Sequence, residues 1–382
     1  MRVAPDRGPA QGHDGVGSRR AAALMEETSM SESVRVFALL GEATLRRQLQ
    51  QAWRGNGTTL CGMHAEGSDS LVEELARVRP DVLLVDAEVD GVRRVVPAAA
   101  SRLRIPVVSL VRSQQPGFAA VRPLEWGVVS LLPREIDSNG GLVAAIESSL
   151  AEAREAQVVD QLEGHFPLSG AFPDAAVFDM RRSLQDASPE SKVVVVGAGV
   201  GGPMAMRRIL SELQSLVVSP VVYAQRIHES LAAPLVQWLE HHTGASVQRA
   251  VTGKLEVGQV YVVPTGYDAK IVRRGEDTVL EVARSTGANT PSLDLLLESA
   301  GEAYAERTVA VVLSGRGADG TQGLLEVRHR GGFTMVQDRV SSLLYDAPGQ
   351  ARDGGGAIEC LPINEIAERI QMLMRPEPAP RS

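Results

Sequence analysis

The stretch Gly197–Gly202 carries the most obvious chemical pattern in this chain. It reads GAGVGG, follows the apolar run VVVV and precedes an amphipathic segment, so that Gly197, Gly199 and Gly202 satisfy G-x-G-x-x-G. Such a turn between a strand and a helix lets a pyrophosphate approach the amide groups at the helix N-terminus. The pattern predicts a nucleotide-dependent oxidoreductase only if an acidic residue follows about 20 positions later, at the end of the next strand.

The next strand does not supply that acid. The apolar segment 217–224 is followed by Gln225 and Arg226. An arginine there would suit a phosphorylated ribose, so nucleotide-dependent oxidoreduction stays open as a remote alternative. The glycines also have a purely structural interpretation, a tight turn that lets the helix pack closely on the sheet.

Other reactive side chains are sparse. Cys61 and Cys360 are far apart, there is no C-x-x-C pair, and no H-E-x-x-H spacing occurs. We therefore predict no catalytic metal and no cofactor. His228 and the pair His241–His242 are expected to be surface or helix-capping histidines.

The elements that must position the glycine turn alternate between strand and helix. Buried-strand candidates lie at 192–196, 217–224, 260–264, 309–314 and 333–336, with amphipathic segments between them. Residues 33–157 show the same alternation. The pattern predicts an α/β protein with two doubly wound parallel-sheet domains, at 33–157 and 191–375. Residues 1–32 are expected to be a disordered extension, 158–190 a linker and 376–382 a loose tail.

Both predicted domains resemble one family, the chemotaxis receptor-glutamate methylesterases (CheB). The segment GAGVGGP at 197–203 resembles the family's G-A-S-T-G-G-P, and VVLSGRGADGTQG at 311–323 resembles its L-T-G-M-G-x-D-G-x-x-G. VVYAQRIH, YVVPTG, TPSLDLL and the closing LPINEIAERI match further family segments in the same order. The resemblance covers about 33 to 375. It implies a receiver domain of flavodoxin-like strand order joined to a Rossmann-like methylesterase domain.

The resemblance also implies a Ser-His-Asp triad for ester hydrolysis, and this chain departs from it at two of three positions. The serine position is Gly199, the histidine position is Arg226, and only the aspartate is retained, as Asp319. A guanidinium stays protonated near neutral pH and cannot act as a general base. We therefore expect impaired or lost esterase activity; an active methylesterase that demethylates receptors and releases methanol is the alternative.

Around these positions the implied cleft includes Gly197, Gly201, Gly202, Gln225 and Arg316. In a binding role, Arg226 and Arg316 would offer cations to a glutamate side chain of a receptor. Asp319 could instead serve only as the cap of the helix that begins near Gly320.

The receiver-like half shows the same loss. The resemblance places the phosphoacceptor at Asp86, after the apolar run VLLV, but the paired acids that hold Mg²⁺ fall on Leu40 and Gly41, with Glu42 one place further on. The expected hydroxyl falls near Val111, with Ser109 two residues earlier, and the expected lysine falls on Leu132. We expect a pseudo-receiver whose Asp86 is not efficiently phosphorylated.

Composition limits the partners. Lys and Arg total 39 against 47 Asp and Glu, a net charge of −8, which disfavours binding along a nucleic-acid backbone. No apolar run approaches the roughly 20 residues that span a bilayer. We expect a cytoplasmic protein that interacts with methyl-accepting chemoreceptors or with a chemosensory histidine kinase or methyltransferase. Its oligomeric state is left open.

Overall fold

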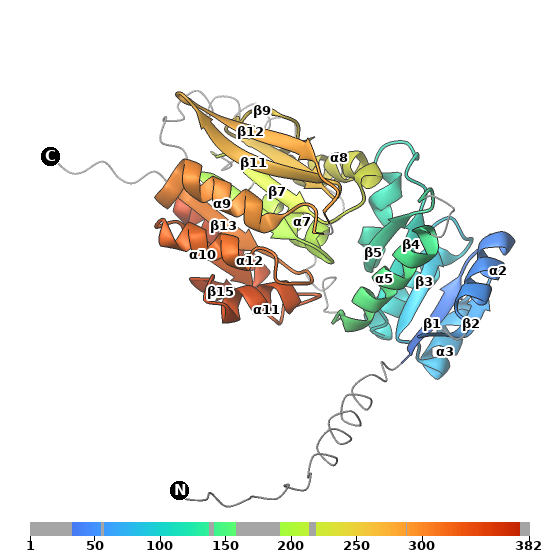
Figure 1. Cartoon of the computed structure of the whole chain (residues 1–382). Coiled ribbons are helices and arrows are strands. Elements are labelled where there is room, and N and C mark those ends of the chain that lie inside the picture. The colour runs from blue at the N-terminus through green and yellow to red at the C-terminus, as the bar shows by residue number, and fades with distance from the viewer. Residues whose placement is uncertain are drawn as a thin grey trace, which may run out of the picture.

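A computed structural model describes residues 33–54, 57–136, 141–157, 192–213, 219–287 and 289–374. They form two α/β units that lie side by side (Figure 1). The expected N-terminal extension, linker and tail lie outside the described residues. Within the described part of the chain, no helix combines the length and the apolar character needed to cross a bilayer.

The first unit is built on a five-stranded parallel sheet of order β2-β1-β3-β4-β5, which is the expected flavodoxin-like order. Its central strands are continuous apolar runs because helices cover both faces of the sheet. The strands are β1 (Val34–Leu39), β2 (Thr58–His64), β3 (Val82–Asp86), β4 (Val107–Val111) and β5 (Val128–Pro133).

Alternate residues of these strands face opposite layers of helices. Phe37, Leu83 and Val85 join the core under α3, α4 and η2, while Val36 and Leu84 join the core under α2 and α5. The helices are α2 (Ala43–Ala52), α3 (Asp69–Val78), α4 (Val92–Pro97), the π-helical turn η1 (Ala98–Arg102), the 3₁₀ segment η2 (Ala119–Trp126) and α5 (Gly141–Glu155).

The second unit is built on a seven-stranded parallel sheet of order β15-β14-β13-β6-β7-β10-β8. Its first strand, β6, lies in the middle with β7 on one side and β13 on the other, so the strand order reverses beside β6. In open parallel sheets such a reversal is where ligands bind. The strands are β6 (Val193–Ala198), β7 (Val221–Gln225), β8 (Ser246–Arg249), β10 (Gln259–Pro264), β13 (Thr308–Val312), β14 (Phe333–Gln337) and β15 (Glu359–Leu361).

Helices again cover both faces of this sheet. α7, α8 and α12 pack on one face, and α9, α10 and α11 pack on the other. The helices are α7 (Gly202–Leu213), η5 (Glu229–Leu231), α8 (Ala232–Thr243), α9 (Leu293–Tyr304), η6 (Ala305–Arg307), α10 (Thr321–His329), α11 (Asp346–Asp353) and α12 (Ile363–Met374). The predicted fold class, two doubly wound parallel-sheet domains, is confirmed.

A small antiparallel sheet that the sequence did not predict packs beside α9. It has the order β11-β12-β9, from β9 (Gly253–Lys254), β11 (Tyr267–Arg274) and β12 (Asp277–Arg284). Ile271 and Leu280 face the core that contains α9, and the backbone N–H of Ile271 donates to Ser299 Oγ at 3.0 Å. Figure 1 shows these strands as a layer distinct from the parallel sheet.

The two units contact each other directly. Trp238 Nε1 in α8 donates to Glu125 Oε1 in η2 at 3.0 Å, and His242 Nε2 lies 3.2 Å from the same oxygen. On another part of the boundary, the backbone N–H of Gln157 donates to the carbonyl of Leu343 at 2.6 Å. Residues of β5 and α5 in the first unit line a common cavity with the glycine turn of the second.

Candidate functional site

The glycine turn lies at the carboxyl end of β6, where the strand order reverses. Packing explains several of its glycines: a Cβ on Gly197 would lie 2.0 Å from Leu293 Cδ2, and one on Gly202 would lie 2.2 Å from Gln225 Oε1. Gly201 has φ +83°, a left-handed conformation that glycine adopts without strain. The turn is thus accounted for by close packing and a left-handed bend, without a bound nucleotide.

Gln225 holds this turn from the neighbouring strand. Its side chain is only 2% exposed, and its Nε2 donates to the carbonyl of Gly199 at 3.0 Å. Its Oε1 accepts a hydrogen bond from the hydroxyl of Tyr223. The amide therefore has a structural role under the floor of the cleft.

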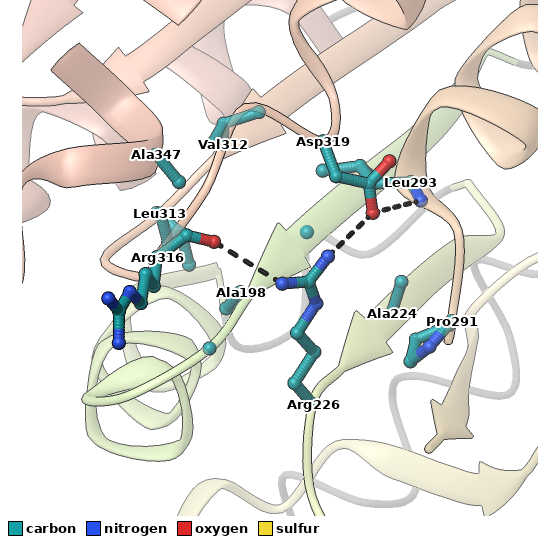
Figure 2. A pocket seen from close by; sticks show the side chains of 13 residues that line it. Ala198, Ala224, Arg226, Pro291, Leu293, Val312, Leu313, Arg316, Asp319 and Ala347 are labelled. Carbon is teal, nitrogen blue, oxygen red and sulfur yellow. Dashed lines mark hydrogen bonds and ion pairs between the residues drawn. The ribbon is translucent and has the colours of Figure 1, made fainter. Parts of the chain in front are cut away.

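Arg226 and Asp319, both named from the sequence, meet in the cleft (Figure 2). Arg226 Nη2 donates to Asp319 Oδ2 at 2.9 Å, and its Nη1 donates to the carbonyl of Arg316 at 3.3 Å. The Asp319 side chain is 10% exposed and that of Arg226 is 31% exposed. The residue at the base position is a cation bound to the retained carboxylate.

Asp319 also caps a helix, but not the one expected. Its Oδ2 and Oδ1 accept the backbone N–H groups of Leu293 and Asp294, each at 3.0 Å, at the start of α9. The predicted cap of the helix beginning near Gly320 is therefore wrong. Gly320 is itself the N-cap residue of α10, and Asp294 Oδ1 accepts from Gly320 and Gly323 at 2.9 and 2.7 Å. The capping is reciprocal. Asp319, which precedes α10, accepts hydrogen bonds from the start of α9, and Asp294, which lies in α9, accepts hydrogen bonds from the start of α10.

The small cavity beside this pair has no nucleophilic side chain in its wall. A cavity of about 30 Å³ is enclosed by thirteen residues that include Gly199, Arg226 and Asp319, and none of the thirteen is Ser, Thr or Cys. Ser314 lies nearby but is fully buried, with Oγ donating to the carbonyl of Val200 at 2.6 Å and accepting the N–H of Leu344 at 2.9 Å. Its hydroxyl is committed to structure.

The candidate histidines behave as the sequence suggests only in part. His228 caps η5, since its Nδ1 accepts the N–H of Ser230 at 3.3 Å, and burial lowers the pKa of its imidazole. That capping role is confirmed. The pair His241–His242 ends α8, but His242 is not a surface residue: its side chain is 18% exposed and it contacts Glu125 of the other unit.

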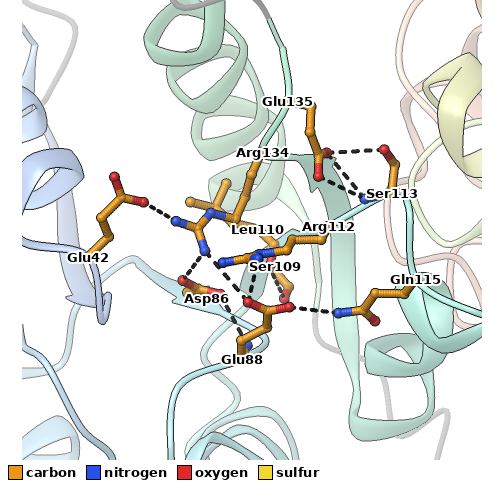
Figure 3. A network of polar contacts seen from close by, with 10 residues as sticks. All are labelled: Glu42, Asp86, Glu88, Ser109, Leu110, Arg112, Ser113, Gln115, Arg134 and Glu135. Carbon is orange, nitrogen blue, oxygen red and sulfur yellow. Dashed lines mark hydrogen bonds and ion pairs between the residues drawn. The ribbon is translucent and has the colours of Figure 1, made fainter.

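In the first unit, Asp86 ends β3 and is 3% exposed. Arg134 Nη1 donates to Asp86 Oδ2 at 3.0 Å, and the same guanidinium also pairs with Glu42 and lies 3.9 Å from Glu88 (Figure 3). Burial raises the pKa of Asp86, against the lowering effects of the Glu88 amide and Arg134. An internal cation therefore lies against the phosphoacceptor position.

Sequence reasoning missed Arg134. It assigned the basic position to Leu132, within β5, whereas the side chain that reaches Asp86 follows the strand end by one residue. The basic residue directly after LLP was the available signal. Ser109 is fully buried, and among the described residues its Oγ donates a hydrogen bond to the carbonyl of Leu110, at 3.4 Å, rather than to Asp86. Among the described residues, no group of three or more His, Cys, Asp or Glu side chains is arranged to hold a metal ion.

Comparison with known proteins gives one consistent family. The CheB methylesterase family matches residues 194–370. A protein-glutamate methylesterase/protein-glutamine glutaminase of Carboxydothermus hydrogenoformans is 30% identical over 321 residues, covering 80% of this chain and 89% of that protein. The protein-glutamate methylesterase FrzG of Myxococcus xanthus is 29% identical over 292 residues, covering 76% of this chain and 84% of FrzG.

Solved structures give matches to each unit. The CheB methylesterase catalytic domain of Thermotoga maritima matches with a TM-score of 0.45 and 26% identity, covering 48% of this chain and 98% of that domain. The response regulator domain of Thermotoga maritima CheB matches with a TM-score of 0.27 and 17% identity, covering 32% of this chain and 96% of that domain.

Proposed function

This chain belongs to the CheB family of protein-glutamate methylesterases, and we propose that it has lost ester hydrolysis and acts by binding in a chemosensory pathway. The observation that carries the proposal is the ion pair between Arg226 and Asp319. The carboxylate that would orient an imidazole instead neutralises a guanidinium.

The chemistry of this pair argues against turnover. A guanidinium has no lone pair available for a proton near neutral pH, so Arg226 cannot activate a hydroxyl. Gly199 offers no hydroxyl to activate. In triads that act as a unit, loss of the nucleophile or of the base lowers turnover on the order of a millionfold.

An active methylesterase is the competing function, favoured by the names of the relatives and by retention of Asp319. Methanol release from methylated receptor separates the two functions. We expect no release above that of a heat-inactivated sample. Release by the wild-type chain that rises with its concentration would reject the proposed loss.

A double variant that restores the serine and the histidine of the triad provides a second test. In Gly199→Ser the new Cβ would lie 3.1 Å from Gly315 Cα, closer than an ordinary contact, so the neighbouring backbone would have to shift by a few tenths of an ångström. Arg226→His would free Asp319 to orient an imidazole. We expect the double variant to release methanol and each single variant to release none. The single variants are the matched controls, because each restores only half of the nucleophile and base pair.

We propose in addition that the first unit is a pseudo-receiver. Its support is that Arg134 binds the Asp86 carboxylate and that Leu40 and Gly41 offer no carboxylate for Mg²⁺. Incubation with a small phosphodonor and Mg²⁺, followed by intact mass measurement, should show no phosphoryl adduct. A stoichiometric adduct that disappears in Asp86→Asn would show that the domain is a working receiver.

The binding partners follow from the family. We propose methyl-accepting chemoreceptors, or a chemosensory histidine kinase or methyltransferase, as partners in the cytoplasm, and no nucleic-acid partner. Arg316 is the better placed cation for a receptor glutamate, because Arg226 is already paired. Receptor binding should therefore weaken more in Arg316→Ala than in Arg226→Ala; binding unaffected by both would remove the cleft from the recognition surface.

A further inference from the structure

A second, larger cavity lies between the two units. Its volume is about 320 Å³, within the range of about 300–1,000 Å³ typical of small-molecule sites. β5 and α5 of the first unit form one wall, and the glycine turn, the end of β7 and Arg316 form the other. Because both units contribute, a molecule held there would contact both at once.

Two opposite charges face this cavity without meeting each other. Glu152 projects from α5 and Arg316 from the loop after β13, and both line the cavity. No hydrogen bond or ion pair of 4.0 Å or less joins Glu152 to any other described residue. Arg316 makes one long contact, 3.7 Å from its Nη2 to Glu155 Oε1. Figure 2 shows its side chain pointing away from the Arg226–Asp319 pair.

Glu152 and Arg316 nevertheless interact electrostatically through the cavity. Burial raises the pKa of Glu152, and the positive charges of Arg316 and Arg226 act in the opposite direction. A partly buried carboxylate without a direct partner is costly, and so is a guanidinium without a strong acceptor. The space between them suits a group that brings an ammonium to the carboxylate and a carboxylate to the guanidinium.

The rest of the wall combines apolar side chains with the polar ones of Ser130, Ser148, Ser149, Gln225, His228 and Thr265. Leu124, Leu132, Val200, Pro203 and Ile227 line the cavity beside the two charges. A pure anion would meet the repulsion of Glu152, and a pure cation would meet that of Arg316 and Arg226. A zwitterion with an uncharged side chain meets neither repulsion and covers the apolar wall.

We propose that this cavity binds a free α-amino acid with an apolar or small side chain. Its carboxylate would accept hydrogen bonds from Arg316 and its ammonium would donate to Glu152. Because these residues belong to different units, the bound amino acid would stabilise the observed arrangement of the two units. This inference does not depend on whether ester hydrolysis has been lost.

Isothermal titration calorimetry of the full chain with L-leucine, L-valine and L-serine tests the proposal. We expect at least one of the three to bind at millimolar concentration or below. The leucine analogues 4-methylpentanoate, which lacks the amine, and 3-methylbutylamine, which lacks the carboxylate, should bind at least about tenfold more weakly, since each loses one charge-assisted contact.

Matched variants assign the two contacts. Glu152→Gln and Arg316→Gln should each weaken binding of the amino acid by about tenfold or more. Glu155→Gln is the control: Glu155 lies near Arg316 but does not line the cavity, so binding should stay within about threefold. Thermal unfolding of each variant shows whether it folds, and the two leucine analogues test the wild-type chain without any substitution.

The proposal fails if none of the three amino acids binds at 10 mM, or if both leucine analogues bind as tightly as leucine. It fails equally if folded Glu152→Gln and Arg316→Gln bind like the wild-type chain. Methanol release measured on the same samples tests the loss of ester hydrolysis separately. Failure of the amino-acid proposal can therefore be distinguished from failure of the proposed function.

Discussion

At the residue scale, Asp319 shows how a triad position can be retained without its chemistry. Its two oxygens accept from a guanidinium and from two backbone N–H groups at the start of α9. Each of these contacts stabilises the folded chain and none involves proton transfer. Helix capping and pairing with Arg226 are sufficient physical reasons for an aspartate at this position.

Replacement of Asp319 by alanine should therefore lower the free energy of unfolding by about 3 kcal/mol, because it leaves Arg226 without its carboxylate and removes the acceptor of two N–H groups at the start of α9. Asp319→Asn keeps an oxygen acceptor and should cost about half as much. Urea denaturation followed by circular dichroism measures both losses. If Asp319→Ala lowers the free energy of unfolding by less than about 1 kcal/mol, neither the ion pair with Arg226 nor the hydrogen bonds to α9 stabilise the fold appreciably.

The resemblance to the CheB family, rather than any local spacing, assigned Gly199, Arg226 and Asp319 to one site. Gly199, Arg226 and Asp319 do meet at one cleft, and Asp86 does end a buried strand. The role of Arg134 was not predicted. Arg134 and Asp86 are 48 residues apart in the sequence, and local residue spacing does not indicate which distant side chains meet in the fold. The reciprocal capping by Asp294 and Asp319 was not predicted for the same reason.

At the element scale, the crossing of α9 and α10 depends on a glycine. A Cβ on Gly323 in α10 would lie 2.6 Å from Leu297 Cβ and 3.0 Å from the Cα of Asp294, so backbone would have to move. On the other helix, a Cβ on Gly301 would lie 3.2 Å from the flexible Arg330 side chain and 3.6 Å from Val327 Cα. The same substitution should therefore have opposite effects on the two helices.

Gly323→Ala should destabilise the chain by about 1–3 kcal/mol through overpacking. Gly301→Ala should be neutral or stabilise it by up to about 1 kcal/mol, because alanine has the higher helix propensity. Thermal unfolding of the two variants side by side gives the comparison. Equal shifts in the same direction would mean that the helices do not cross as closely as described.

Strands buried on both faces were predictable because they form continuous apolar runs, as in VVVV before Gly197. The antiparallel strands β11 and β12 were not predicted. Their buried and exposed positions alternate, as at Ala269, Lys270 and Ile271, so their apolar content per residue is low. A search for alternation over 267–284 would have found them.

At the scale of the whole molecule, the arrangement of the two units could not be predicted from sequence, since it depends on contacts between distant segments. Glu125 and Trp238 are 113 residues apart and meet in a partly buried hydrogen bond. The interface between the two units also contains Phe118, whose ring centroid lies 5.0 Å from that of His241 and 5.7 Å from that of His242. One carboxylate thus accepts both polar contacts from α8.

The carboxylate of Glu125 makes the stability of the interface between the two units depend on pH. Burial alone would raise the pKa of Glu125, but hydrogen bonds from His242 and Trp238 and the charges of His242 and Arg122 outweigh it, so its pKa lies below the usual 4.5. Arg207, whose guanidinium lies 5.6 Å from the Trp238 ring, adds further positive charge. A carboxyl whose pKa is lowered by folding stabilises the folded state above its unfolded pKa, and this contribution is lost as pH falls through the folded pKa.

Glu125→Gln should therefore cost about 1–2 kcal/mol of unfolding free energy at pH 7, because a neutral amide replaces a charged acceptor. The difference from wild type should shrink as pH falls below 4.5, where the wild-type carboxyl becomes protonated too. Urea denaturation at pH 7 and at successively lower pH measures it, with Arg122→Gln as the control, since its 3.9 Å contact on the exposed side should contribute little. A cost for Glu125→Gln that stays constant across this pH range would show that the charge of Glu125 does not hold the two units together.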